Sequence, residues 1–230
     1  MGEESEVHAV LWSLGPLQVT VSIAITWLIM AILGLLSLVA KLSSSEPPGR
    51  LQTVAEAIVC TIEDAVRSVI PRNYSLVMPF VATLWLFLVP ANLAGLVPGL
   101  GSPTADLSVT AALAILVFFS VHWFGVKSDG WKRYLLHFLQ PSPILLPLHI
   151  ISEITRTAAL AVRLFGNIMS MEMAALIMLL VAGFLMPVPI LMLHVVEALV
   201  QAYIFGTLAL IFIAGGISTH NQRSNNRSVS

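Results

Sequence analysis

A permanently charged side chain, Arg163, lies within one of the most apolar parts of the sequence. The surrounding stretch, TAALAVRLFGNIMSMEMAALIMLLVAGF, runs from Thr157 to Phe184 and has the composition of a membrane-spanning helix. A charge at the centre of a bilayer costs from about 2.5 to more than about 10 kcal/mol, and arginine cannot lose its proton in a protein at physiological pH. Arg163 must therefore face an anion, water or a carbonyl-lined cleft, as half of a fixed pair inside the bundle or as part of an ion pathway.

The polar neighbours of Arg163 in the sequence include no carboxylate that could neutralise it from the same helix. At about 100° per residue, Asn167 shares the face of Arg163 and Arg156 lies near that face, whereas Glu172 points to the opposite side. Glu153 is near the predicted cytoplasmic end of the helix, where solvent would also explain a charge. The partner of Arg163 must therefore come from another helix or another chain.

The last apolar segment carries a second polar pattern, LHVVEALVQAYIF. His194, Glu197 and Gln201 stand at positions i, i+3 and i+7, which form one stripe on a helix. The stripe is either an internally hydrogen-bonded helix contact or the wall of a path for protons or cations, because His and Glu exchange protons near neutral pH when their pKa values are shifted. No second histidine stands at metal-ligand spacing, so neither a metal nor another cofactor is expected.

The composition restricts the chain to one broad class. Of its 230 residues, 57% are hydrophobic and 10% are charged, and the mean hydropathy is +0.92, whereas a soluble domain has about 25% charged residues. The sequence therefore predicts a polytopic membrane protein surrounded by lipid. The net charge of −1 argues against a nucleic-acid partner, and the single cysteine, Cys60, excludes a disulfide framework. No nucleotide-binding motif is present, so the chain is not expected to be catalytic alone.

The apolar runs predict the helices that position these residues. A bilayer core requires about 20 apolar residues per helix, and the fourth run is long enough to require a strongly tilted helix or a surface segment leading into a span. The fold class is an all-α membrane protein with the long fourth span packed against the last one. We expect one integral membrane domain, residues 1–230, with an outer segment, 1–15, and a cytoplasmic tail, 218–230. The predicted spans are Pro16–Ala40, Leu76–Leu96, Leu107–Val126, Ile144–Phe184 and Ile190–Ile217.

An amphipathic helix is predicted between the first two spans, over Leu51–Ile70. Its charged residues lie away from its apolar face, which is typical of a helix at the membrane surface or against another subunit. A sixth crossing is disfavoured by the four charges. The apolar face consists of Val54, Ile58, Val59, Ile62, Val66 and Val69, and the charges are Glu56, Glu63, Asp64 and Arg67.

The distribution of basic residues predicts the orientation. Basic residues concentrate in cytoplasmic loops, and here they occur in alternate connections, whereas the N-terminus, the GLVPGLGSPTAD loop and the FLMPVPI turn contain none. Five crossings then place the N-terminus outside and the C-terminus in the cytoplasm of a bacterial plasma membrane or an equivalent organelle membrane. The basic residues are Lys41, Arg50, Arg67 and Arg72, then Lys127, Lys132 and Arg133, and finally Arg223 and Arg227.

The motif RLFGN at Arg163, followed by Glu172 and by LVQAYIF on the next helix, resembles subunit a of the F-type ATP synthase membrane sector. The segments NLAGLVPGLGSPTADLSVT (Asn92–Thr110) and PILLPLHIISEITR (Pro143–Arg156) resemble an outer loop and the approach to a long tilted helix in the same family. The resemblance is close over residues 76–214 and loose in the first third of the chain.

The resemblance implies a role for each polar residue. Arg163 corresponds to the family's essential arginine, which faces the carboxylates of a rotating c-ring. Four residues correspond to positions along a half-channel from the outer side, and Glu197 adds a carboxylate where many members are apolar. Glu153 and Arg156 correspond to the cytoplasmic half-channel. The outer residues are Asn167, Glu172, His194 and Gln201.

These correspondences imply an ion-translocating stator subunit that couples ion flow to ring rotation and ATP synthesis or hydrolysis. The implied partners are the c-ring, peripheral-stalk b-type subunits, and protons or sodium ions. His149 stands where many members have glutamate, which leaves the coupling ion open. The alternative function is a subunit of a secondary ion transporter or exchanger, which also requires buried charges and tilted helices.

Overall fold

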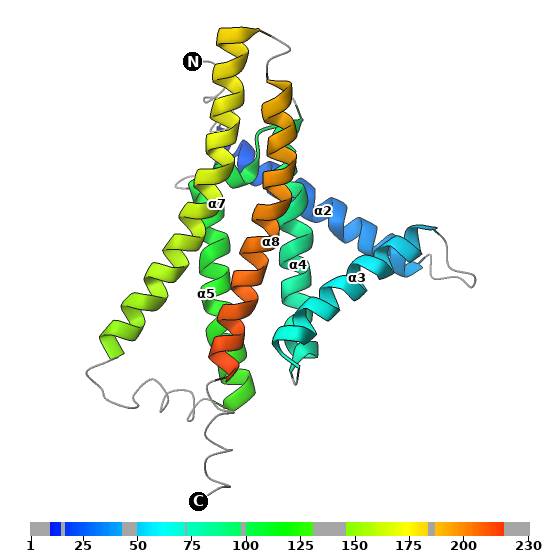
Figure 1. Ribbon diagram of the computed structural model, residues 1–230, viewed down its shortest axis with the longest axis vertical. Coiled ribbons are helices and arrows are strands. Elements are labelled where there is room, and N and C mark those ends of the chain that lie inside the picture. The colour runs from blue at the N-terminus through cyan, green and yellow to red at the C-terminus, as the bar shows by residue number, and fades with distance from the viewer. Residues whose placement is uncertain are drawn as a thin grey trace, which may run out of the picture.

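The protein is an all-α bundle, as predicted, with a small hairpin at its N-terminal end (Figure 1). The computed structural model describes residues 10–14, 17–42, 50–71, 73–97, 100–130, 146–183 and 187–218. Five helices in these ranges are long and apolar enough to cross a membrane, and α3 lies outside this group. The helices are α2 (Val21–Leu42), α3 (Arg50–Val69), α4 (Tyr74–Leu93), α5 (Leu107–Asp129), α7 (Leu146–Ala182) and α8 (Val188–Ser218).

The first span begins later than the sequence predicts. Residues 17–20 belong to β2 (Leu17–Thr20), which pairs in antiparallel fashion with β1 (Val10–Leu14), so that Leu14 is opposite Leu17. The helix α2 therefore begins at Val21 rather than at Pro16. Alternating strands rich in Val and Leu are too short to show their period clearly beside a long apolar run, which explains the error.

The long fourth apolar run forms one continuous helix. Its 37 residues from Leu146 to Ala182 measure about 55 Å at 1.5 Å per residue, well beyond the ~30 Å of a bilayer core. In Figure 1, α7 runs obliquely across α5 and continues beside α8. Of the two alternatives that the sequence leaves open, the structure therefore selects the tilted helix.

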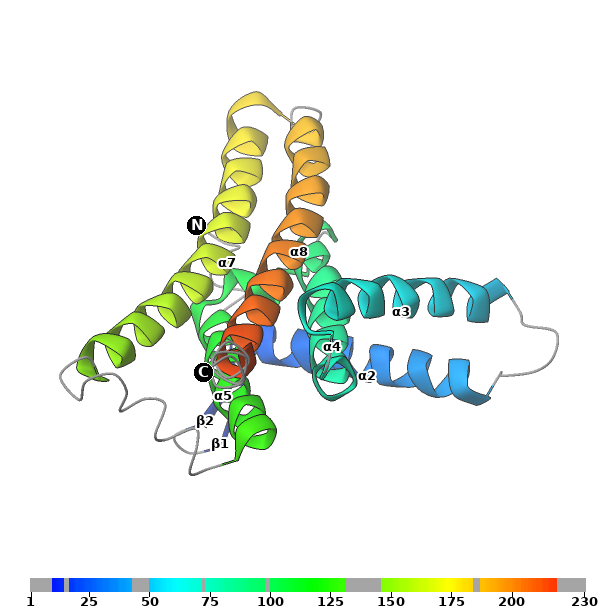
Figure 2. The same cartoon turned by 60° about the horizontal axis from the view of Figure 1, so that its bottom comes forward.

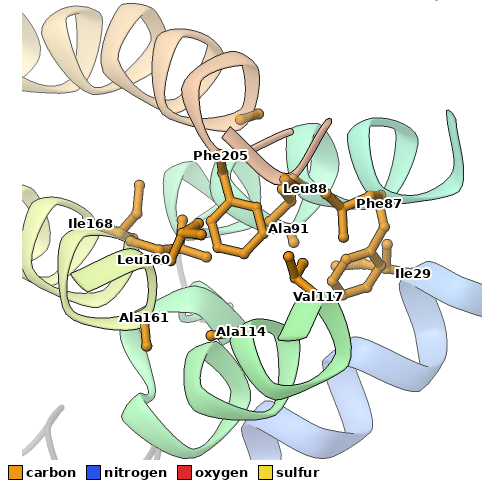
Figure 3. Close-up of a cluster of buried hydrophobic side chains, with 14 of the residues drawn as sticks. Ile29, Phe87, Leu88, Ala91, Ala114, Val117, Leu160, Ala161, Ile168 and Phe205 are labelled. Atoms are coloured by element: carbon orange, nitrogen blue, oxygen red, sulfur yellow. The ribbon is translucent and has the colours of Figure 1, made fainter. Parts of the chain in front are cut away.

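The core lies where α2, α4, α5, α7 and α8 meet. Leu88 of α4, Leu164 of α7 and Phe205 of α8 are almost completely buried there, and Figure 3 shows Phe205 directed between Ile168 and Ala91. Small residues on α7 and α5, Ala161 and Ala114, join the same cluster. This packing fixes α7 against α8, as the sequence predicts.

The amphipathic helix α3 docks on the bundle by only part of its apolar face. Ile62 and Val66, in its second half, are buried against α4 and α8, whereas Val54, Ile58 and Val59 are exposed. Figure 2 shows α3 and α2 extending side by side away from the other helices. The exposed half of the face is apolar, as required of a helix that meets lipid or another subunit.

The connection between α4 and α5 is described at residues 94–97 and 100–106. It contains two short 3₁₀ helices, η1 (Ala94–Leu96) and η2 (Pro103–Ala105). Asp106 caps α5 by accepting a hydrogen bond of 2.9 Å from the backbone N–H of Ser108, which satisfies one of the free donors at the start of the helix. In the bundle, η2 packs against α7 and α5.

Candidate functional site

Arg163 lies on the exposed side of α7. Its neighbours Leu160, Leu164 and Ile168 are buried in the core. At about 100° per residue, Arg163 stands about 100° around the helix from the middle of this buried stripe, and it is exposed. Within the described residues, Arg163 forms no ion pair or hydrogen bond, since the ion pair found there joins Arg67 to Glu63. A fixed partner for Arg163 is therefore absent from the part of the chain that the structure describes.

The helix that carries Arg163 is also the span least covered by the rest of the chain. Only 11% of the most apolar window of α7 is buried, against 50% for the windows of α8 and α4. Most of the apolar surface of α7 is therefore free for lipid or for another subunit. The exposed apolar residues include Ile151, Ile154, Val162, Leu180 and Val181.

One turn beyond Arg163, Asn167 makes the polar link between α7 and α8. Its side-chain nitrogen donates a hydrogen bond of 2.9 Å to Oε1 of Gln201. Gln201 is 2% exposed, and its Nε2 has no hydrogen-bond partner among the described residues. A buried donor without a partner costs roughly 1–3 kcal/mol, so a site for water or an ion beside Gln201 would relieve this cost.

The other two residues of the α8 stripe continue this polar line. His194 is 1% exposed, and its Nε2 lies 3.3 Å from the backbone oxygen of Asn92 on α4. Glu197 is half-buried, and its Oε2 has no hydrogen-bond partner within the described ranges. The stripe therefore makes an internal helix contact at His194. Within the described residues, it leaves a hydrogen-bond acceptor of Glu197 and a hydrogen-bond donor of Gln201 without a partner.

Glu172 lies in a different direction from Arg163, as the helical period predicts. Its Oε1 accepts a hydrogen bond of 3.0 Å from the backbone N–H of Ser102, in the connection between α4 and α5. Arg163 and Glu172 therefore lie on different sides of α7. Arg163 lies on the exposed side of α7, and Glu172 faces the α4–α5 connection.

Three polar residues that the sequence analysis did not single out organise this connection. Asn92, Ser102 and Thr104 are completely buried. Thr104 Oγ1 lies 2.8 Å from Asn92 Oδ1 and 2.7 Å from Ser102 Oγ, and Asn92 Nδ2 donates to the carbonyl oxygen of Ala198 at 3.1 Å. Their only signal in the sequence is the presence of polar residues inside the quoted NLAGLVPGLGSPTAD segment. Two of their partners, Ala198 and Glu172, are 106 and 70 positions away along the chain.

The residues assigned to the cytoplasmic side form a separate group. The guanidinium carbon of Arg156 lies 4.7 Å from the centre of the Phe212 ring on α8, a cation–π contact. Glu153 is half-buried, and its backbone oxygen accepts a hydrogen bond of 2.9 Å from Thr157. Within the described residues Glu153 and Arg156 form no ion pair with each other. The side chain of His149 is outside the described residues.

The polar groups are therefore distributed at three levels along α7. At 1.5 Å per residue, Glu172 is about 14 Å from Arg163 in one direction and Glu153 is about 15 Å from it in the other. The groups on the two sides do not share a hydrogen bond within the described residues. Such an arrangement gives two polar regions separated by one permanent charge.

Comparison with known proteins shows the family. The sequence matches the ATP synthase A chain family over residues 23–214. It is 53% identical to ATP synthase subunit a of Legionella pneumophila over the full length of both chains. It is 57% identical to ATP synthase subunit a 2 of Pelobacter propionicus over 95% of this chain and 96% of that protein, and 56% identical to ATP synthase subunit a 1 of Hahella chejuensis over 94% of each. At this identity and coverage, the chain belongs to the ATP synthase A chain family, the subunit a of the F-type ATP synthase.

Proposed function

We propose that this chain is the ion-translocating stator subunit, with two offset half-channels on either side of Arg163. The observation that carries the proposal is an exposed, permanently charged side chain without a described partner on the least covered span. A charge in that position is stabilised by an anion that faces it, and no described residue of this chain supplies one. The carboxylates of a rotating c-ring would meet this requirement.

The outer half-channel would follow the polar line between α7 and α8. An ion entering from outside would meet Glu172, His194 and Glu197 before it reaches the Asn167–Gln201 pair near Arg163. The unpartnered atoms of Glu197 and Gln201 support this route, because a buried acceptor and donor one turn apart would bind a hydrated ion or a water chain.

The inner half-channel would begin near Glu153 at the other end of α7. A ring carboxylate that has carried its ion through lipid in neutral form would release it there. The cation–π contact with Phe212 would hold Arg156 beside this exit. Arg163 would attract each emptied carboxylate and block a direct leak between the half-channels. Each translocated charge would contribute about 2.3 kcal/mol per 100 mV of membrane potential.

The proposed assembly follows from the family. As a membrane-sector subunit, the chain is not catalytic by itself. Its partners would be the c-ring and the peripheral-stalk b-type subunits. The basic residues favour an outer N-terminus and a cytoplasmic C-terminus, in a bacterial inner membrane. The conducted ion would be a proton or a sodium ion.

Replacement of Gln201 by leucine tests the outer half-channel. Leucine removes the partner of Asn167 and fills the polar space with an apolar side chain, so ATP-driven ion uptake into inverted membrane vesicles is expected to fall at least about tenfold, equal to ~1.4 kcal/mol. The matched control is Val200→Leu on the neighbouring, exposed position, which should keep normal uptake. Equal uptake by both variants would contradict the proposed route. A protonophore and a sodium series in the same vesicles identify the ion.

A further inference from the structure

The α4–α5 connection encloses the carboxylate of Glu172 in a way that the family assignment does not describe. We propose that Gly95 and Ser102 form a cradle that positions Glu172 for ion entry, so that they are positioning residues for transport. This inference rests on the proposed function of Glu172. It concerns how that side chain is held.

The first side of the cradle is a backbone donor. The N–H of Ser102 donates to Glu172 Oε1 at 3.0 Å. A backbone N–H donates and does not exchange protons as a side chain does, so it can orient the carboxylate but cannot relay an ion. No hydrogen bond joins Oε2 to another described residue, which leaves this oxygen for an incoming proton or cation.

The second side of the cradle is the missing side chain of Gly95. A Cβ built at this position would overlap Oε1 of Glu172 and would lie 3.2 Å from the Cβ of Ser102. Any other residue at position 95 would therefore push the carboxylate away from the Ser102 N–H. The φ angle of Gly95 is not positive, so the need for glycine here comes from space and not from backbone conformation.

The cradle is anchored to two helices. Ser102 Oγ lies 2.8 Å from the carbonyl oxygen of Ala91 and 2.7 Å from Thr104 Oγ1, which in turn contacts Asn92 Oδ1. Asn92 donates to the carbonyl of Ala198 on α8, and its backbone oxygen lies 3.3 Å from Nε2 of His194. Because these groups are buried, the network fixes Glu172 relative to the α8 stripe.

The two hydroxyl groups in this network cannot satisfy every contact at once. Ser102 and Thr104 bring two hydroxyl protons to three contacts, with the Ala91 oxygen, with Asn92 Oδ1 and with each other. At any moment one contact is therefore without a proton. The network holds the loop in place by shared hydrogen bonds while the Ser102 N–H remains committed to Glu172.

The first test is a double-mutant cycle of Gly95→Ala and Glu172→Asp. The added methyl group should displace the carboxylate and lower ATP-driven ion uptake about tenfold in the otherwise unmodified chain. Aspartate is one methylene shorter, so in the Glu172→Asp background the same methyl group should change uptake by less than about twofold. Gly34→Ala is the matched control, because a Cβ there meets nothing within 4 Å. Equal losses in both backgrounds would overturn the cradle.

The second test removes the backbone donor without relying on Gly95. Ser102 has φ −67°, which proline adopts without strain. Ser102→Pro eliminates both the N–H and the hydroxyl group, whereas Ser102→Ala eliminates the hydroxyl group alone. Uptake should be lower in Ser102→Pro than in Ser102→Ala by about tenfold. This difference should vanish in combination with Glu172→Leu, because leucine cannot accept the hydrogen bond from the Ser102 N–H. The same difference in the Glu172→Leu background would overturn the inference.

A third variant separates this inference from the proposed function. If Arg163→Ala transports normally in the assembled complex, the proposed function fails. A different result would overturn the cradle alone. In that case Arg163→Ala loses transport, but Gly95→Ala shows the same uptake as Gly34→Ala, and Ser102→Pro shows the same uptake as Ser102→Ala.

Discussion

Replacement of Arg163 by alanine is expected to abolish ATP-driven ion uptake while the complex still assembles. The side chain is exposed and has no partner among the described residues, so its removal should cost the fold little. The loss of the charge would remove both the attraction for ring carboxylates and the barrier between the half-channels. Uptake should fall at least about 100-fold, equal to ~2.7 kcal/mol, as measured by an ion-sensitive dye in inverted vesicles.

The lysine variant distinguishes a coupling arginine from a structural one. Lysine preserves a positive charge but can lose its proton in an apolar setting and lacks the planar guanidinium face. Arg163→Lys should therefore also lose coupled uptake, whereas a fixed structural pair would tolerate it. Equal amounts of assembled complex in the membranes of both variants are the control. Normal uptake by Arg163→Lys would favour the structural role.

The largest effect on folding is expected for Gly206→Ala on α8. A Cβ at Gly206 would overlap the indole ring of Trp85 on α4, and this ring stacks on Tyr203 at 6.1 Å between centroids with an interplanar angle of 4°. Since α4 and α8 share the core, the added methyl group must either displace the Trp85 ring or separate the two helices. Overpacking of this kind costs about 1–3 kcal/mol, and we expect a lower apparent unfolding temperature of the purified complex at a fixed scan rate.

Gly215→Ala is the matched control on the same helix. A Cβ at Gly215 meets nothing within 4 Å, and alanine favours a helix over glycine by about 1 kcal/mol, so this variant should be as stable as the unmodified protein or more stable. A second control combines Gly206→Ala with Trp85→Leu, which removes the ring that the methyl group meets. If Gly206→Ala is as stable as Gly215→Ala, the packing of α4 on α8 is not as described.

The sequence is sufficient to predict the membrane spans because each one is long and strongly apolar. The second to fifth spans lie where the apolar runs predict them, and α3 occupies Arg50–Val69, almost the range of its amphipathic period. The N-terminal hairpin is missed because its strands adjoin the first apolar run. The choice between a tilted helix and a surface segment for the fourth run depends on packing with α5 and α8, which a periodic pattern does not contain.

The positions of the candidate-site residues can be predicted from the sequence only when the residues lie on the same helix. The separation of Arg163 from Glu172 around α7 follows from the helical period. The contacts between helices do not follow from this period, because Asn167 and Gln201 are 34 positions apart and Asn92 and His194 are 102 apart. Single polar residues such as Ser102 and Thr104 in a Gly- and Pro-containing loop are too common to indicate a buried network. Their role depends on the tertiary fold.

The Arg163 face of α7 is expected to meet another chain in the membrane. Ala159 is exposed and lies one turn before Arg163 on that helix. In a Cys60→Ser background, Ala159→Cys is labelled with a photoactivatable benzophenone. This label should crosslink to the ring subunit and stop ATP-driven ion uptake. The same label at Ile115→Cys, on the exposed side of α5, should leave uptake unchanged. Labelling of lipid alone from position 159, with uptake undiminished, would contradict the claim.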